Sequence, residues 1–120
     1  AAAVVASNYL VSLVDVAFVF LESAGIDRQD AVTILYPLIR GTLNNIKTTG
    51  IPEALTGPIA RGDIKTIEDH LEQIQARNKD LLTIYSHLGL HTIGLAREKG
   101  TITPEQAEAL TQLLNKAINR

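Results

Sequence analysis

The sequence contains no cysteine, no methionine and no tryptophan, and it has only two phenylalanines and three tyrosines. The absence of cysteine excludes disulfides, thiolate metal ligands and thiol nucleophiles, and it is typical of a protein from a reducing cytosol. A net charge of −2 creates no field that attracts nucleic acid, and so few aromatic rings offer little for bases to stack on. We therefore expect a cytoplasmic protein that does not bind nucleic acid.

Basic residues are missing around the apolar first segment, residues 1–21, whose only polar side chains belong to Ser7, Asn8, Ser12 and Asp15. Without a basic start the segment does not fit a signal peptide. A charge near the centre of a membrane span costs about 2.5–3.5 kcal/mol, and no Lys or Arg flanks the segment to orient it. We expect a buried helix of a soluble protein, covered by its neighbours or by a second subunit, and no membrane partner. Its abrupt apolar start indicates a piece of a longer polypeptide.

Strand-like alternation is also absent, and every strong hydrophobic pattern has the period of a helix. The 120 residues predict one all-α domain, 1–120, built as a bundle of about five longer helices plus a short helical turn. The first helix covers about 1–23 and ends at Gly25. The second begins after Asp27, with Asp30 in its first turn. Pro52 is placed to open the single short turn.

Three further helices are predicted after residue 63. Asp63 caps a helix whose apolar stripe contains Ile64, Ile67, Leu71 and Ile74. The next helix covers about 78–99 and ends at Gly100. The last one begins at "TPEQ", where Thr103 and the glutamine three residues later form a capping box.

Four polar side chains, Asn8, Ser12, Asp15 and Glu22, fall on one stripe of the apolar first helix. Because unpaired burial costs about 1–3 kcal/mol for each group, they must face water or satisfy one another. One interpretation is therefore a solvated strip or a hydrogen-bond network. The other is that the stripe faces a cleft, with Asn8 at its mouth.

Histidines with the spacing of a metal pair occur once, at His87 and His91. The sequence H-E-x-x-H is absent, since Leu88 follows His87, and the same helix face carries the residues of an ordinary solvated surface. We predict that these histidines, and His70 on the preceding helix, are surface residues, and we expect no metal site.

No self-sufficient catalytic set is present, because the sequence contains neither G-x-S-x-G nor G-x-G-x-x-G. The stretch "GPIARGD" has the glycine spacing of a phosphate loop, but Asp63 and Ile64 replace the lysine and the hydroxyl that such a loop requires. A capped turn with Arg61 in solvent is the simpler interpretation. The alternative is that Arg61 and the free N–H groups of the helix start hold a carboxylate or phosphate.

Several segments together resemble a known bacterial family. The order is "AAAVVASNYLVSL", "LYPLIRGTLNNI", "ALTGPIARGDIKTIEDHL" and "IYSHLGLHTIGLA", and "LTGPIARGD" is its most specific part. Over nearly the whole chain the sequence is similar to the family of domain of unknown function 2520. In that family a helical domain follows a Rossmann-like domain, in proteins described as NAD(P)-dependent oxidoreductases. Their layout is similar to that of pyrroline-5-carboxylate reductase and of the 6-phosphogluconate dehydrogenase superfamily.

The resemblance implies that the chain has a 6-phosphogluconate dehydrogenase C-terminal-domain-like fold and forms a homodimer. It also implies that NAD(P) binds mainly to an N-terminal Rossmann-like domain of the same polypeptide. Asn8 matches an asparagine that commonly reaches the reaction centre in the wider superfamily, where it would orient the substrate. The usual lysine one turn earlier is replaced by Val4.

The resemblance also implies which residues bind the substrate. Five residues would approach the cleft: Thr42, Asn45, Thr56, Gly57 and Pro58. Separately from the resemblance, the charge of Arg61 beside a helix start predicts that it pairs with an acidic group of the substrate. We therefore predict the substrate-side and dimerisation domain of an NAD(P)-dependent oxidoreductase that acts on a small molecule. The alternative is a non-catalytic helical module for dimerisation or regulation.

Overall fold

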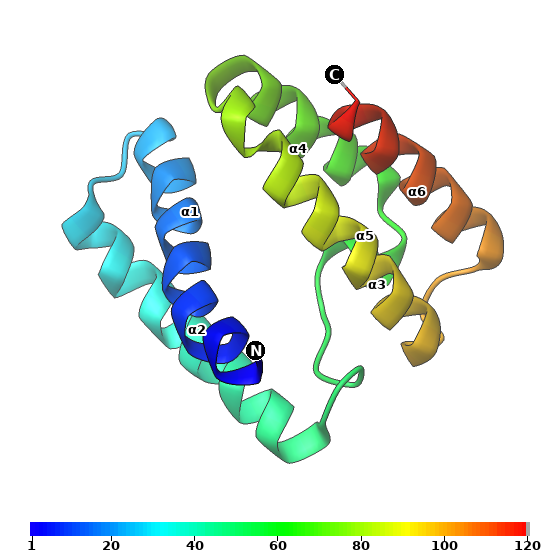
Figure 1. Cartoon of the computed structure of the whole chain (residues 1–120), viewed down its shortest axis with the longest axis horizontal. Helices are drawn as coiled ribbons and strands as arrows, with labels where there is room; N and C mark the ends of the chain where they lie inside the picture. The colour runs from blue at the N-terminus through cyan, green and yellow to red at the C-terminus, as the bar shows by residue number, and fades with distance from the viewer. Residues whose placement is uncertain (120) are drawn as a thin grey trace. The chain divides into compact units, whose positions relative to one another are not determined.

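The computed structural model describes residues 1–119, and every regular element in that range is a helix (Figure 1). The elements are a π-helical turn Val4–Asn8, α1 Tyr9–Ser23, α2 Arg28–Thr49, α3 Pro58–Arg61, α4 Ile64–Arg77, a 3-10 turn Lys79–Leu81, α5 Leu82–Lys99 and α6 Pro104–Ile118. The predicted all-α class, with five longer helices and one short one, is confirmed.

Contacts within the chain divide it into two compact units, residues 1–41 and 42–120. The division falls inside α2, after Gly41, so the last two turns of that helix belong to the second unit. Each unit is described by itself below.

The second unit contains the hydrophobic core. Here α5 and α6 pack along each other, and both α3 and α4 contact this pair (Figure 1). The largest fully buried apolar side chains are Ile67 and Leu71 of α4 and Leu110 and Leu114 of α6. Ile67, Leu71 and Ile74 are buried, so the predicted apolar stripe of α4 faces the core as expected.

Side-chain hydrogen bonds cap the N-termini of α4 and α6 at the residues that the sequence predicts. Asp63 Oδ1 accepts a hydrogen bond of 3.1 Å from the N–H of Thr66. Thr103 Oγ1 accepts one from the N–H of Gln106, and Gln106 Oε1 in turn accepts one from the N–H of Thr103. These bonds satisfy N–H groups that have no partner inside a helix, which fixes both starts.

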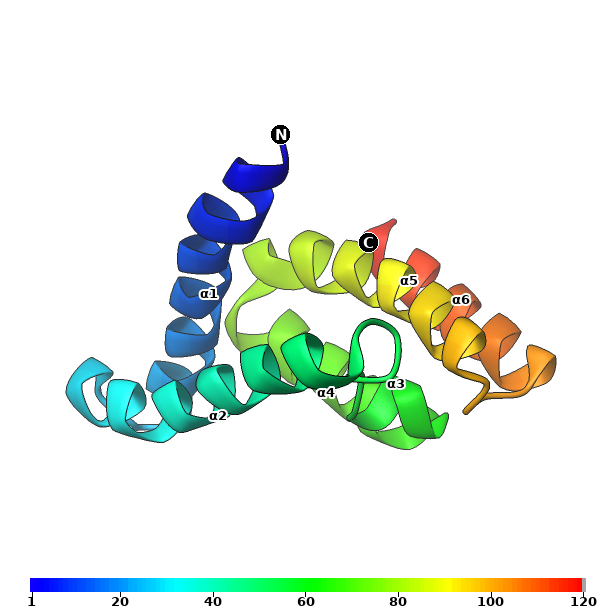
Figure 2. The same cartoon turned by 90° about the horizontal axis from the view of Figure 1, so that it is seen from below.

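The first unit consists of α1, a short turn and the beginning of α2, and the two helices diverge from the turn (Figure 2). The turn has the predicted signals: Gly25 has φ of 88°, and Asp27 Oδ1 accepts from the N–H of Asp30 at 2.9 Å. Arg28 then connects the two helices, because its guanidinium lies 2.9 Å from carboxylate oxygens of both Asp15 and Glu22.

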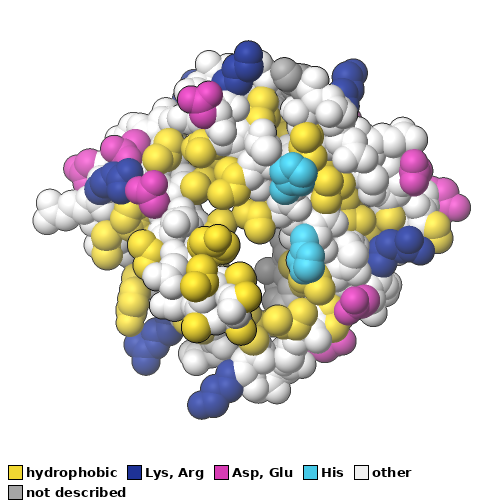
Figure 3. Space-filling model, in the orientation of Figure 1, with side chains coloured by type: hydrophobic (Ala, Val, Ile, Leu, Met, Phe, Trp, Pro, Cys, Tyr) yellow, Lys and Arg dark blue, Asp and Glu magenta, His cyan; other side chains and the backbone are white. Residues whose placement is uncertain are grey.

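The expectation that this chain buries its first helix is wrong. α1 has no buried residue, and Val5, Tyr9 and Val11 are 59%, 56% and 71% exposed. Within the first unit only the beginning of α2 is available to cover it, which is too little surface. Hydrophobic side chains are consequently exposed over this part of the molecule (Figure 3).

By length and composition alone, the helical segment Val4–Ser23 could cross a membrane, since its mean hydropathy is 2.0. Asp15 lies in the middle of this segment and is ion-paired with Arg28. The absence of a membrane partner stays a prediction.

The short helix lies later than predicted. Residues 51–54 form a hydrogen-bonded turn that includes Pro52, whereas the helix itself starts at Pro58. Gly57 precedes it with φ of 95°, a conformation that residues with a Cβ rarely adopt. Gly57 therefore permits the sharp change of direction into α3, and Pro58 takes the first helical position, where its missing N–H costs nothing.

Candidate functional site

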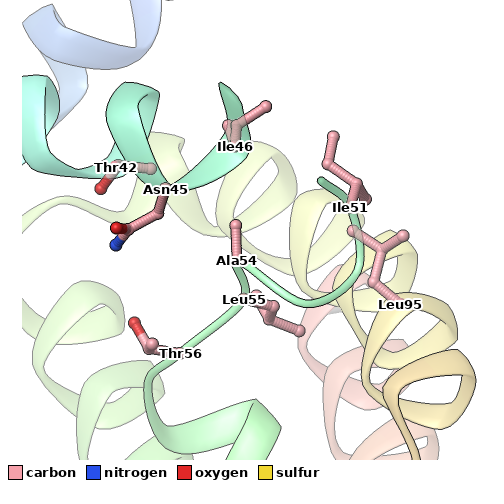
Figure 4. Close-up of a pocket in the computed structure, with 8 residues that line it drawn as sticks. All are labelled: Thr42, Asn45, Ile46, Ile51, Ala54, Leu55, Thr56 and Leu95. Atoms are coloured by element: carbon pink, nitrogen blue, oxygen red, sulfur yellow. The ribbon is translucent and has the colours of Figure 1, made fainter. Parts of the chain in front are cut away.

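A pocket of about 310 Å³ lies in the second unit, at the C-terminal end of α2. Its lining comes from three parts of the chain, namely the end of α2, the loop that follows it, and α5 (Figure 4). The lining residues are Thr42, Asn45, Ile46, Ile51, Ala54, Leu55, Thr56 and Leu95.

Helical spacing explains the contribution of α2. Thr42, Asn45 and Ile46 are three and four positions apart, so their side chains lie on one face of the helix. α2 ends at Gly50, whose N–H donates to the carbonyl of Ile46 at 2.9 Å and whose φ is 77°. The chain then turns back beneath the same helix face, which brings Thr56 opposite Asn45 (Figure 4).

The loop that forms the floor of the pocket is held by hydrogen bonds within itself and by one from α5. Within the loop, the N–H of Ala54 donates to the carbonyl of Gly50, and the N–H of Leu55 donates to the carbonyl of Pro52. From α5, Lys99 Nζ donates to the carbonyl of Leu55 at 2.5 Å. Leu95 precedes Lys99 by one helical turn, so the face of α5 that anchors the loop also provides an apolar wall of the pocket.

The pocket has a polar side and an apolar side. The hydroxyls of Thr42 and Thr56 and the amide of Asn45 point toward one common space in Figure 4, while Leu95 and Ile51 lie at the opposite side. None of the eight lining residues is charged. The site can therefore form several neutral hydrogen bonds beside an apolar surface, without a fixed charge to select an ion.

Three of the residues implied by the family resemblance are thus brought together: Thr42, Asn45 and Thr56 line the same pocket. Gly57 and Pro58 directly follow Thr56 and begin α3, so they fix the backbone beside the pocket. That these residues bind a substrate stays a prediction.

Arg61 lies outside this group. It is at the end of α3, its side chain is 63% exposed, and its nearest carboxylate oxygen is that of Asp63 at 3.7 Å. The pKa of Asp63 is lowered, mainly by the hydrogen bonds from Thr66 and to a smaller extent by Arg61. This geometry agrees with a capped turn whose arginine is in solvent.

Asn8 lies in the first unit, in the exposed π-helical turn before α1. Further along the polar stripe, Asp15 and Glu22 both pair with Arg28, which supports the interpretation of the stripe as a solvated strip. The catalytic role implied for Asn8 stays a prediction.

The histidines are exposed, as the sequence predicts. His70 Nδ1 lies 2.8 Å from the phenolic oxygen of Tyr85, with the rings edge to face, so this contact connects α4 to α5. Burial raises the pKa of Tyr85 to about 12. In residues 1–119 no group of three or more histidine or carboxylate side chains converges in a way that would hold a metal.

Sequence reasoning did not identify the apolar half of the pocket. Ile51, Ala54 and Leu55 lie within five residues before Thr56, so their proximity to it was a usable signal. Leu95 and Lys99 come from a helix more than thirty residues later, and no local pattern shows that this helix face meets the loop.

Comparison with known proteins finds no matching curated protein and no matching solved structure. A family model does match, over residues 1–92, which include the pocket-lining residues of α2 and of the loop. Since this match covers more than half of the sequence, the chain belongs to the family described as Domain of unknown function (DUF2520).

Proposed function

We propose that this chain is the substrate-side and dimerisation domain of an NAD(P)-dependent oxidoreductase. One observation carries the proposal. Thr42, Asn45 and Thr56, which the family resemblance implies as substrate-binding residues, line one pocket although they come from two different segments. In this proposal their hydroxyl and amide groups bind and orient a small substrate, and the role of Asn8, which lies in the first unit, is proposed from the family resemblance alone.

The residues of this chain do not fit the nicotinamide cofactor itself. A dinucleotide site needs a glycine-rich turn between a strand and a helix, and the sequence has no G-x-G-x-x-G while residues 1–119 include no strand. The pocket also lies at the lower end of the roughly 300–1,000 Å³ range of ligand sites, which suits a small molecule. In this proposal the cofactor is bound by a nucleotide-binding domain elsewhere in the polypeptide.

The test uses the full polypeptide that contains this chain. We expect its reading frame to encode a strand followed by a glycine-rich fingerprint before Ala1, and the purified protein to bind NADPH saturably. In a reductase assay with a panel of small carbonyl and imine compounds, Asn45→Ala is expected to lower kcat/KM at least tenfold and to leave the NADPH affinity unchanged.

Asn44→Ala is the matched control, because Asn44 is the adjacent exposed residue of α2 and does not line the pocket. A polypeptide without a nucleotide-binding domain, or one that does not bind NADPH, would refute the oxidoreductase proposal. Equal effects of the two alanine variants would refute the assignment of the pocket.

The second candidate is a non-catalytic module for dimerisation or regulation. It is favoured by the apolar surface of the first unit, where α1 has no buried residue. A groove of about 400 Å³ follows α1 there, lined by Leu10, Val11, Val14 and Phe18, with Asp15 and Arg28 beside them. Under either candidate, this surface is proposed to bind a second copy of the chain.

A further inference from the structure

The two sides of the pocket call for two different properties in one ligand. On the polar side, the amide of Asn45 and the hydroxyl of Thr56 can each donate and accept hydrogen bonds, and the hydroxyl oxygen of Thr42 can accept them. On the apolar side, Ile51 and Leu95 offer only hydrocarbon (Figure 4). A ligand that satisfies both sides has a head that donates and accepts, and a short hydrocarbon tail.

The absence of charged lining residues also restricts the head group that a ligand can carry. A carboxylate or an ammonium that leaves water needs an opposite charge, and no lining side chain supplies one. Lys99, whose ammonium group donates to the carbonyl of Leu55, is not one of the lining residues. An uncharged head is therefore favoured over an ionic one of the same size.

The geometry points to a small neutral amphiphile as the ligand of this pocket: a short aliphatic chain that ends in an uncharged donor–acceptor group such as a carboxamide. This inference rests on the proposed function and names the substrate class for the same pocket. A primary carboxamide offers two donors and one carbonyl acceptor, which Asn45, Thr42 and Thr56 can match from two sides.

Three probes with six carbon atoms each separate the head groups: hexanamide, hexanoate and hexylammonium. Binding of each probe to the full polypeptide is measured at pH 7 by ligand-observed NMR, without added nicotinamide cofactor. Hexanamide is expected to bind at least tenfold more tightly than either charged probe.

Asn45→Asp locates the binding and tests the charge argument. The substitution places a carboxylate on the polar side of the pocket, and Asn45 is exposed on α2, so the fold does not depend on its side chain. We expect this variant to lose affinity for hexanamide and to prefer hexylammonium at least tenfold over hexanoate. Asn44→Asp adds the same charge one residue away, outside the pocket, and is expected to keep the preference for hexanamide.

Binding of hexanoate or hexylammonium to the unmodified protein as tight as that of hexanamide would overturn the inference. So would identical preferences in the two aspartate variants, or no binding of hexanamide. Because these measurements need no cofactor, they fail independently of the proposed function. NADPH-dependent turnover that depends on Asn45, found together with a charged ligand, would refute only the ligand class.

Discussion

Gly89 lies on α5 where Leu114 of α6 packs against it. A Cβ at this position would lie 2.7 Å from Cδ1 of Leu114, a side chain that is fully buried. Because Leu114 is fully buried, its side chain must shift within a close-packed core to admit this Cβ. We expect Gly89→Ala to lower the free energy of unfolding by about 1–3 kcal/mol, measured by urea denaturation, despite the higher helix propensity of alanine.

Gly94 on the same helix is the matched control for this substitution. It is exposed, and a Cβ there would meet no atom within 4 Å. Gly94→Ala should therefore raise the free energy of unfolding by about 0.5–1 kcal/mol, because only the helix propensity changes. Stabilisation by both substitutions would show that α5 and α6 do not approach as closely as described.

At the scale of elements, Tyr85 of α5 faces α4, where its phenolic oxygen contacts His70. Burial disfavours the charged phenolate, so the pKa of Tyr85 is raised from 10.0 to about 12 in the folded protein. As the pH rises, Tyr85 therefore ionises in the unfolded chain before it ionises in the folded protein. The stability is therefore full below about pH 10 and decreases between about pH 10 and 12, by at most about 1.4 kcal/mol for each pH unit.

Tyr85→Phe isolates this contribution, because all other titrating groups are common to both proteins. The variant lacks the bond to His70 and should be less stable at neutral pH by a constant amount. Above about pH 10 the difference in unfolding free energy between wild type and variant should shrink. Parallel curves over this range would contradict the burial of Tyr85 between the helices.

The elements themselves were largely predictable, because their ends depend on local chemistry. Asp63 and Thr103 cap helices that begin within a residue or two of them, and the stripe of Ile67 and Leu71 directly predicts the buried face of α4. The short helix was misplaced because both Pro52 and Pro58 can occupy a first helical position. Only the contacts of the whole loop decide between them.

The pocket was predictable only in part, for the same physical reason. Thr42 and Asn45 share a helix face through their spacing, whereas the approach of Thr56 depends on how the loop returns from Gly50. Anchoring of that loop by Lys99 is a contact between residues 44 positions apart. Such long-range contacts follow from packing, which a local hydrophobic period does not encode.

At the scale of the whole molecule, the exposed apolar side chains concentrate on α1 and α2. Val5 in the turn before α1 and Tyr9 and Val11 of α1 are each more than half exposed, and Val11 lines the groove along α1. Each large aliphatic side chain gains about 1.5–3 kcal/mol when it is fully buried, so covering this surface with a second copy would supply a substantial driving force. The pairing of Asp15 with Arg28 beside the groove adds a polar edge, as interfaces between proteins commonly have.

We therefore expect a dimer in solution, measured by light scattering after size-exclusion chromatography, that Val11→Asp converts to a monomer with unchanged helical circular dichroism. Leu88→Asp is the control: Leu88 is also exposed, at 45%, but lies on α5 in the second unit, so this variant should remain dimeric. A charge at position 11 opposes dimerisation because its desolvation in an apolar interface is uncompensated. Flotation with phosphatidylcholine vesicles tests whether a membrane, instead of a second copy of the chain, covers this apolar surface. A protein that floats with the vesicles, or that stays monomeric before any substitution, would contradict the dimer.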